Sequence, residues 1–141
     1  MLELAKIRPD DTVVAVGIGS NLLATGVLAH LGPDGSVVAV EGFVDSLEEL
    51  RTACDDPRLS YLVGTADVLP LPDASADVVV ADLELGSTDV AGELFRVLRT
   101  GGRVAVLALA EPERVGAILT SAGFSDVVFN AGGGVAAGTK P

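Results

Sequence analysis

Residues 13–21 read VVAVGIGSN, a short run of small apolar side chains followed by a glycine-rich turn and the polar pair Ser20-Asn21. An apolar run of this length bounded by glycine is typical of a strand buried on both faces of a parallel sheet. Glycine at a strand end lets the backbone approach a ligand that a β-carbon would block, and the N-terminus of a following helix offers free N–H groups. Strand-to-helix turns in any α/β protein also favour glycine, so this stretch predicts either a ligand-binding turn or a purely structural one.

The rest of the chain repeats this alternation of short apolar runs and helically spaced apolar residues. We expect strands at residues 12–16, 36–40, 59–63, 76–83, 103–109, 126–130 and 135–138. We expect helices at residues 20–31, 44–54 and 111–122, and one more that carries the apolar stripe Val90, Leu94, Val97 and Leu98 and ends at Thr100-Gly101-Gly102. The last two strands are predicted to form an antiparallel hairpin. The pattern therefore predicts an α/β, doubly wound, Rossmann-like fold with a seven-stranded, mostly parallel sheet.

Composition and charge narrow the class of protein. The chain has 141 residues, of which 49% are hydrophobic and 21% charged, so we expect a single domain over residues 1–141 with its own core. A net charge of −11 repels phosphate backbones and anionic lipid headgroups, which disfavours nucleic acid and membrane as partners. No apolar run approaches the ~20 residues of a membrane span, and we expect a cytoplasmic protein.

Cysteine and histidine are scarce in this sequence. Cys54 is the single cysteine and His30 the single histidine, so the sequence predicts neither an internal disulfide nor a metal site. We expect Cys54 to lie in the core, where free cysteines are usually buried. His30 lies near the end of a predicted helix, where a cation complements the helix dipole, and this position favours a structural role over a catalytic one.

Glu41 follows the second predicted strand, at the sheet edge that the glycine-rich turn also reaches. A carboxylate at this position can accept hydrogen bonds from both hydroxyls of a ribose. An acidic residue that precedes a helix can instead complement the helix dipole. The strand end, the spacing and the glycine-rich turn together favour the ribose interpretation.

Four segments resemble the class I S-adenosylmethionine (SAM)-dependent methyltransferases, in the type 11 group, in order and with the family's spacing. They are residues 15–21 (AVGIGSN), 37–41 (VVAVE), 64–79 (GTADVLPLPDASADVV) and 93–104 (ELFRVLRTGGRV). The first three are similar to the family's first three motifs, and the fourth to the helix-turn-strand segment after them. A terminal hairpin also fits this family better than the dehydrogenases, whose final strands are parallel.

The resemblance implies S-adenosyl-L-methionine as the cofactor. The glycines of the first motif would lie against its methionine part, Glu41 would hold the ribose, and Ala66 and Asp67 would border the adenine. Phe43 would line the other face of the adenine, or else pack in the core. The predicted cofactor-binding residues are Gly17, Gly19, Ser20, Glu41, Gly42, Phe43, Ala66, Asp67 and Asp82.

Three positions depart from the family pattern, and all of them fall in the predicted cofactor site. Ala15 stands where the first motif usually has an acid that helps to hold the cofactor's ammonium group. Asn21 replaces the last glycine of the turn, and Thr65 replaces the acid that accepts a hydrogen bond from the adenine amino group, although Asp67 can substitute for it. Losing charge-assisted hydrogen bonds of roughly 1.5–3 kcal/mol each lowers affinity by one to several orders of magnitude.

Few residues are available to cover the side of the site that would receive the methyl acceptor. The connection from the fifth predicted strand to the next helix is confined to residues 110–113, which include the start of that helix, so we expect a cleft without a lid of its own, covered by a partner protein or by a second copy in a homo-oligomer. Asp82 and Glu84 are placed for general-base or substrate contacts, or are solvated loop carboxylates. No other catalytic residue is predicted, because transfer to a nucleophilic acceptor needs chiefly positioning.

The sequence supports three hypotheses about function. The first is a SAM-dependent methyltransferase that acts on a small-molecule acceptor. The second is a catalytically inactive methyltransferase-like protein that serves as an interaction or regulatory subunit, which the altered positions and the missing lid favour. The third is a nicotinamide-binding module, although the turn lacks the third glycine of that motif and the chain has no room for a substrate domain.

Overall fold

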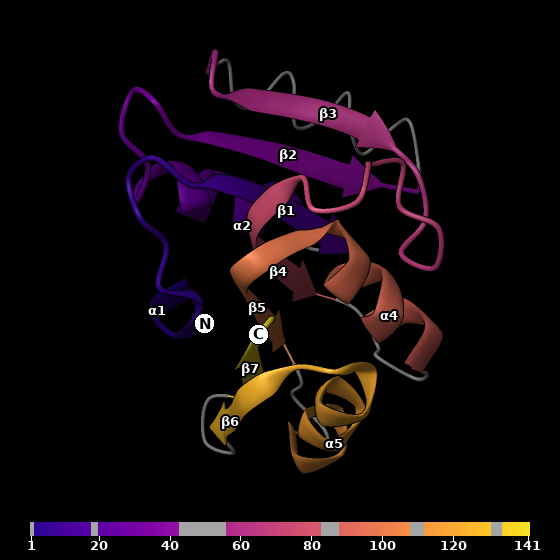
Figure 1. Ribbon diagram of the computed structural model, residues 1–141. Helices are drawn as coiled ribbons and strands as arrows, with labels where there is room; N and C mark the ends of the chain where they lie inside the picture. The colour runs from indigo at the N-terminus through magenta and orange to yellow at the C-terminus, as the bar shows by residue number, and fades with distance from the viewer. Residues whose placement is uncertain (1, 18–19, 43–55, 83–87, 108–111, 131–133) are drawn as a thin grey trace.

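The computed structural model describes residues 2–17, 20–42, 56–82, 88–107, 112–130 and 134–141. Its strands are β1 (Thr12–Gly17), β2 (Ser36–Glu41), β3 (Leu59–Val63), β4 (Ala76–Asp82), β5 (Leu98–Leu107), β6 (Ser125–Asn130) and β7 (Val135–Thr139). Its helices are α1 (Leu2–Ala5), α2 (Ser20–Leu28), α4 (Thr88–Val97) and α5 (Pro112–Ala122). Strands and helices alternate along most of the chain, as the apolar pattern predicts (Figure 1).

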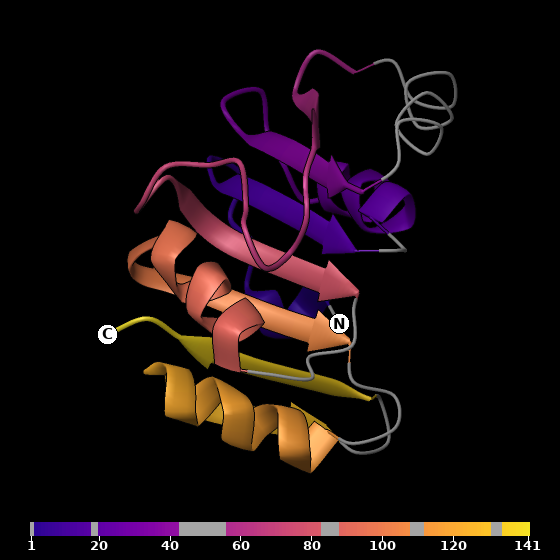
Figure 2. The same cartoon turned by 90° about the vertical axis from the view of Figure 1, so that its right-hand side faces the viewer.

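The strands form a seven-stranded sheet in the order β3-β2-β1-β4-β5-β7-β6. The first five strands in this order pair in parallel, whereas β7 runs antiparallel to β5 and β6 antiparallel to β7. In Figure 2 the arrowheads of the parallel strands point to one side, which is the carboxyl edge of the sheet. The predicted mostly parallel sheet with an antiparallel C-terminal hairpin is therefore confirmed.

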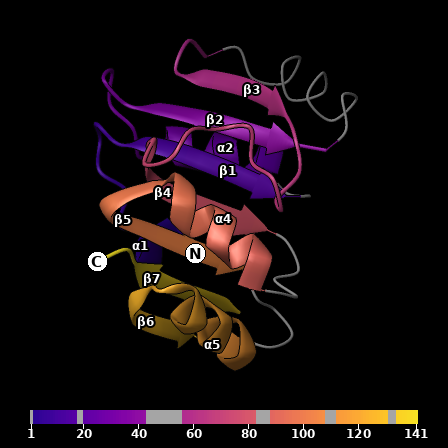
Figure 3. The same ribbon diagram turned by 45° about the vertical axis from the view of Figure 1, so that its right-hand side comes forward.

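Helices cover both faces of the sheet, with α4 and α5 on one face and α2 on the other (Figure 3). Successive side chains of a strand point to opposite faces, and β1 follows this rule. Val14 and Val16 join the core beneath α4 and α5, whereas Val13 and Ala15 join the core beneath α2. Burial on both faces explains why β1 is continuously apolar, as a central strand of a parallel sheet has to be.

Helix α2 ends at Leu28, three residues earlier than the sequence predicts. The next residues turn tightly, because the N–H groups of His30 and Leu31 donate to carbonyls three residues back, at 2.9 and 3.2 Å. The Gly32 N–H then donates to the carbonyl of Pro9 at 2.8 Å, which draws the chain toward the start of β1. A contact with a distant segment therefore ends this helix early.

The boundary between α4 and β5 also differs from the prediction. Leu98, predicted as the last apolar residue of the helix, instead begins β5 by pairing with Ala76 of β4. The prediction that Thr100-Gly101-Gly102 ends the helix is wrong, because these residues lie within β5. The predicted helix at residues 44–54, with Cys54, lies outside the described residues.

Candidate functional site

The candidate site lies where the order of the strands reverses. From β1 the chain builds β2 and β3 on one side, and then β4 and β5 on the other. In open α/β sheets, ligands bind outside the carboxyl ends of the strands at such a point. The last residues of β1, β2 and β4 are Gly17, Glu41 and Asp82. Gly17 is paired with Asp82, and β1 and β2 run in parallel register up to Val16 and Val40, so the structure brings three predicted site residues to one edge.

Gly17 has a backbone that other residues rarely adopt, with φ at +113°. A β-carbon built on it would lie 2.0 Å from the carbonyl oxygen of Asp82, far inside van der Waals contact. The ends of β1 and β4 are therefore too close together at this point for any residue that carries a side chain. Gly19 lies outside the described residues, and Ser20 is the first residue of α2.

Glu41 places a buried carboxylate at the same edge. Among the described residues, only Glu41 and Asp11 are polar or charged and buried, at 7% and 6% exposed. Asp11 forms an ion pair with Arg103 at the amino edge of the sheet, and that contact accounts for its burial. The main chain of Glu41 also fixes the neighbouring strand end, because its carbonyl accepts a hydrogen bond from Gly64 at 2.9 Å.

A short turn follows β3 at this edge and carries two further predicted site residues, Ala66 and Asp67. Thr65 and Val68 close the turn through an isolated bridge, and the Val68 N–H donates to the Thr65 carbonyl at 3.3 Å. The Thr65 side chain and backbone N–H groups of the turn donate to the Asp67 carboxylate, and these hydrogen bonds lower the pKa of Asp67. Asp67 is exposed and therefore ionised at neutral pH. Thr65, which departs from the family pattern, thus supports a carboxylate two residues further on.

Other predicted positions have less to contribute. Gly42 is exposed beside Glu41, and Phe43 and Glu84 lie outside the described residues. Ala15 is fully buried in the core beneath α2. His30 is exposed in the turn after α2, at the end of that helix remote from the carboxyl edge.

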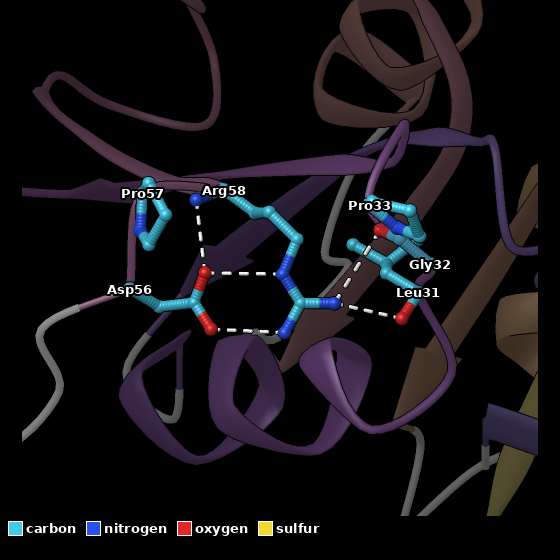
Figure 4. A pocket seen from close by; sticks show the side chains of 6 residues that line it. All are labelled: Leu31, Gly32, Pro33, Asp56, Pro57 and Arg58. Atoms are coloured by element: carbon cyan, nitrogen blue, oxygen red, sulfur yellow. Dashed lines mark hydrogen bonds and ion pairs between the residues drawn. The ribbon is translucent and has the colours of Figure 1, made fainter.

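A depression lies at the amino edge of the sheet, opposite the candidate site, and is lined by Leu31, Gly32, Pro33, Asp56, Pro57 and Arg58 (Figure 4). Arg58 is the one cationic residue among these six, and its guanidinium makes contacts that hold the fold together. The Arg58 guanidinium donates to the Asp56 carboxylate at 2.9 and 3.0 Å and to the Leu31 carbonyl at 2.7 Å. This arrangement joins the end of the α2 turn to the start of β3, and we assign it a structural role.

Two charged residues of α4 make contacts that the sequence did not predict. Glu93 and Arg96 of α4 hold the segment that follows the turn at Thr65–Val68. The available signal was their three-residue spacing, which places them on one side of a helix. Within the described part of the chain, no group of three or more histidine, cysteine or acidic side chains could hold a metal ion. No helix there is long and apolar enough to cross a membrane.

Comparison with known proteins yields one family. Residues 14–106 match the methyltransferase domain family. Among curated proteins, the chain is 37% identical over 107 residues to the uncharacterized methyltransferase Rv3342 of Mycobacterium tuberculosis, covering 74% of this chain and 42% of that protein. It is 28% identical over 109 residues to an arsenite methyltransferase of Halobacterium salinarum, covering 72% of this chain and 28% of that protein. The chain thus spans less than half the length of these relatives.

Solved structures share the fold at lower identity. A chain in the complex that contains the Trm112 methyltransferase activator of Haloferax volcanii superposes with a TM-score of 0.79 at 19% identity, over 99% of this chain and 87% of that one. A SAM-dependent methyltransferase from Aquifex aeolicus gives 0.76 at 21% identity, over 97% of this chain and 85% of that one. At such identities the likeness shows the fold.

Proposed function

This chain belongs to the class I SAM-dependent methyltransferase family, and from that premise we propose that it binds S-adenosyl-L-methionine at the carboxyl edge of its sheet and transfers the methyl group to a small-molecule acceptor. The observation that carries the proposal is the convergence of Gly17, Glu41 and Asp82 where the strand order reverses. Each is the last residue of its strand, and each is among the cofactor contacts that the family resemblance implies.

The chemistry of these residues fits the cofactor. SAM presents two ribose hydroxyls and an adenine amino group as donors, and a cationic sulfonium and ammonium group. Three acidic residues lie at this edge and would interact with such a ligand, namely buried Glu41, half-buried Asp82 and exposed Asp67. The space that a β-carbon on Gly17 would occupy is already filled by the Asp82 carbonyl, so the contribution of Gly17 is to let β1 and β4 end side by side at this edge.

When bound, the cofactor supplies a methyl group activated by the positive charge of the sulfonium. The protein's residues have to bind and orient it. Glu41 would accept hydrogen bonds from the ribose, and Asp67, held ionised by Thr65, would accept one from the adenine amino group in place of the usual acid. Asp82 ends the central strand beside Gly17 and would face the reacting groups. Positioning of this kind is the main requirement of transfer to a nucleophilic acceptor.

The test is calorimetric titration of the purified chain with SAM and with S-adenosylhomocysteine. We expect binding that Glu41→Ala weakens by about tenfold or more, because a charge-assisted hydrogen bond is lost. Asp34→Ala is the matched control, since it removes one negative charge from an exposed turn at the amino edge. Failure of the unmodified chain to bind either compound at millimolar concentration would instead favour the inactive, subunit-like hypothesis.

We make a separate proposal about a protein partner. The structure from Haloferax volcanii is a complex with a methyltransferase activator, so a chain of this fold occurs bound to another protein. We infer that a partner or a second copy covers the acceptor side of this chain. Sedimentation of the purified chain distinguishes a second copy from a different partner. A chain that covers its own acceptor side sediments with the mass of a dimer. A chain that sediments as a monomer would need a different protein to cover that side.

A further inference from the structure

Residues 64–75 connect β3 to β4 and lie on the same face of the sheet as α4 (Figure 3). Leu69, within this segment, is held at both of its main-chain polar groups by side chains of α4. Its N–H donates to Glu93 Oε1 at 2.8 Å, and its carbonyl accepts from Arg96 Nη2 at 3.1 Å. Its own side chain is buried, at 3% exposed. Leu69 is therefore a fixed point in a connecting segment.

Arg96 extends this contact along the segment. Its Nη1 donates to the Leu71 carbonyl at 2.9 Å and to the Asp73 carboxylate at 2.7 Å. Its Nε donates to Glu93 Oε2 at 2.5 Å, which binds the two α4 side chains to each other. The Glu93 and Arg96 side chains are only 16% and 32% exposed, so solvent screens them less than a typical surface pair.

The four-residue turn at residues 65–68 ends directly before Leu69. On its other side, Gly64 is fixed by the hydrogen bond from its N–H to the Glu41 carbonyl at 2.9 Å. Between these anchors Ala66 is partly buried against the core, whereas Asp67 is exposed and Val68 is 70% exposed, so burial does little to shape the second half of the turn. The position of this second half therefore depends on what holds the chain at Leu69.

We propose that Glu93 and Arg96 are positioning residues for the cofactor, acting through Leu69 to set the turn that borders the adenine. This inference rests on the proposed function, because it assigns the turn at residues 65–68 to the same ligand. Neither residue touches that ligand. Their effect is to hold the Asp67 carboxylate and the Ala66 backbone in the geometry that binds the base, before the base arrives.

The test uses Arg96→Met and two ligands that differ only in the base. S-adenosylhomocysteine carries the amino group, whereas S-inosylhomocysteine carries a carbonyl oxygen in its place. We expect Arg96→Met to weaken binding of the adenine compound by about tenfold and to reduce the preference for it over the inosine compound. Loss of discrimination between bases is a local property of the turn that a general loss of stability does not produce.

Three further variants separate positioning from folding. Arg96→Lys keeps the charge but cannot donate to Leu69, Leu71 and Glu93 together, so we expect it to behave as Arg96→Met does. Arg99→Met is the matched control, because Arg99 pairs with Asp77 at 3.0 Å and does not contact the turn in the described structure. If Arg96→Met is too unstable to purify, Glu93→Gln tests the same anchor, since it removes the charge that holds Arg96.

The outcomes are distinguishable. Weaker binding with lost base discrimination in the Arg96 variants, and unchanged binding in Arg99→Met, would support the inference. A lower melting temperature in Arg96→Met with unchanged affinity and discrimination would overturn the inference while leaving the proposed function in place. An unmodified chain that binds neither compound would overturn the proposed function, and this inference with it.

Discussion

Gly17 and Asp82 face each other as paired residues at the ends of β1 and β4, and a β-carbon on Gly17 would lie 2.0 Å from the Asp82 carbonyl oxygen. Strand pairing therefore demands glycine at this position before any ligand is bound. The sequence left a structural and a ligand-binding interpretation of this turn open. The structural role is now established by geometry, and the ligand-binding role is tested separately by titration.

We predict that Gly17→Ala destabilises the fold by at least about 2 kcal/mol, because it adds steric overlap to a strained backbone. Urea unfolding followed by circular dichroism measures the change. The loss should be the same with and without S-adenosylhomocysteine if it comes from strand pairing alone. A midpoint equal to that of the unmodified chain would show that β1 and β4 separate easily at their ends.

Gly92 gives the opposite prediction. It lies in α4, is exposed, and a β-carbon on it would have no atom within 4 Å. Alanine is the better helix former because it restricts the unfolded chain, so Gly92→Ala should stabilise the protein by about 0.5–1 kcal/mol. The same urea series measures it. A destabilised variant would mean that this face of α4 is in contact with something.

The fold was predictable where the local pattern decides it. Strands β1, β2 and β4 have ends within one residue of those predicted, because burial on both faces makes each of them a continuous apolar run bounded by polar residues or glycine. The junction at Val97 and Leu98 was not predictable in this way. Both residues are apolar and fully buried, and contacts with a segment distant in sequence end the helix there, namely the pairing of Leu98 with Ala76 and a hydrogen bond from Ser75 to the Val97 carbonyl.

In the candidate site, too, some residues could be predicted from the sequence and others could not. Glu41 and Asp82 were predicted because each ends a strand, and parallel strands bring their ends to one edge. The contacts of Glu93 and Arg96 with Leu69 were not predicted, because charged residues on an amphipathic helix face solvent by default. Their partner Leu69 comes from another element, and no local pattern in the sequence specifies that contact.

Arg103 makes a third prediction about stability. Its guanidinium forms an ion pair with buried Asp11 and donates to the Ala5 carbonyl at 3.1 Å, which ties α1 to β5. Arg103→Met would leave a buried carboxylate without its cation, at a cost of about 3 kcal/mol in the free energy of unfolding. Arg99→Met, which breaks a more exposed pair, should cost less than about 1 kcal/mol. Equal losses in the two variants would contradict this ranking.

Asp56 provides a prediction about pH. Hydrogen bonds from Arg58 lower the pKa of Asp56 from its usual 3.8 to about 2. Because the folded pKa lies below the unfolded one, the contact stabilises the protein fully above about pH 4, and this contribution is lost as the pH falls toward 2. In Arg58→Met the pKa of Asp56 should return toward 3.8, and the variant should lose less stability than the unmodified chain over that range.

Carboxyl-carbon NMR titration measures the pKa of Asp56, and Arg99→Met is expected to leave it unchanged. An Asp56 that titrates near 3.8 in the unmodified chain would show that Arg58 holds only the carbonyls at the end of α2.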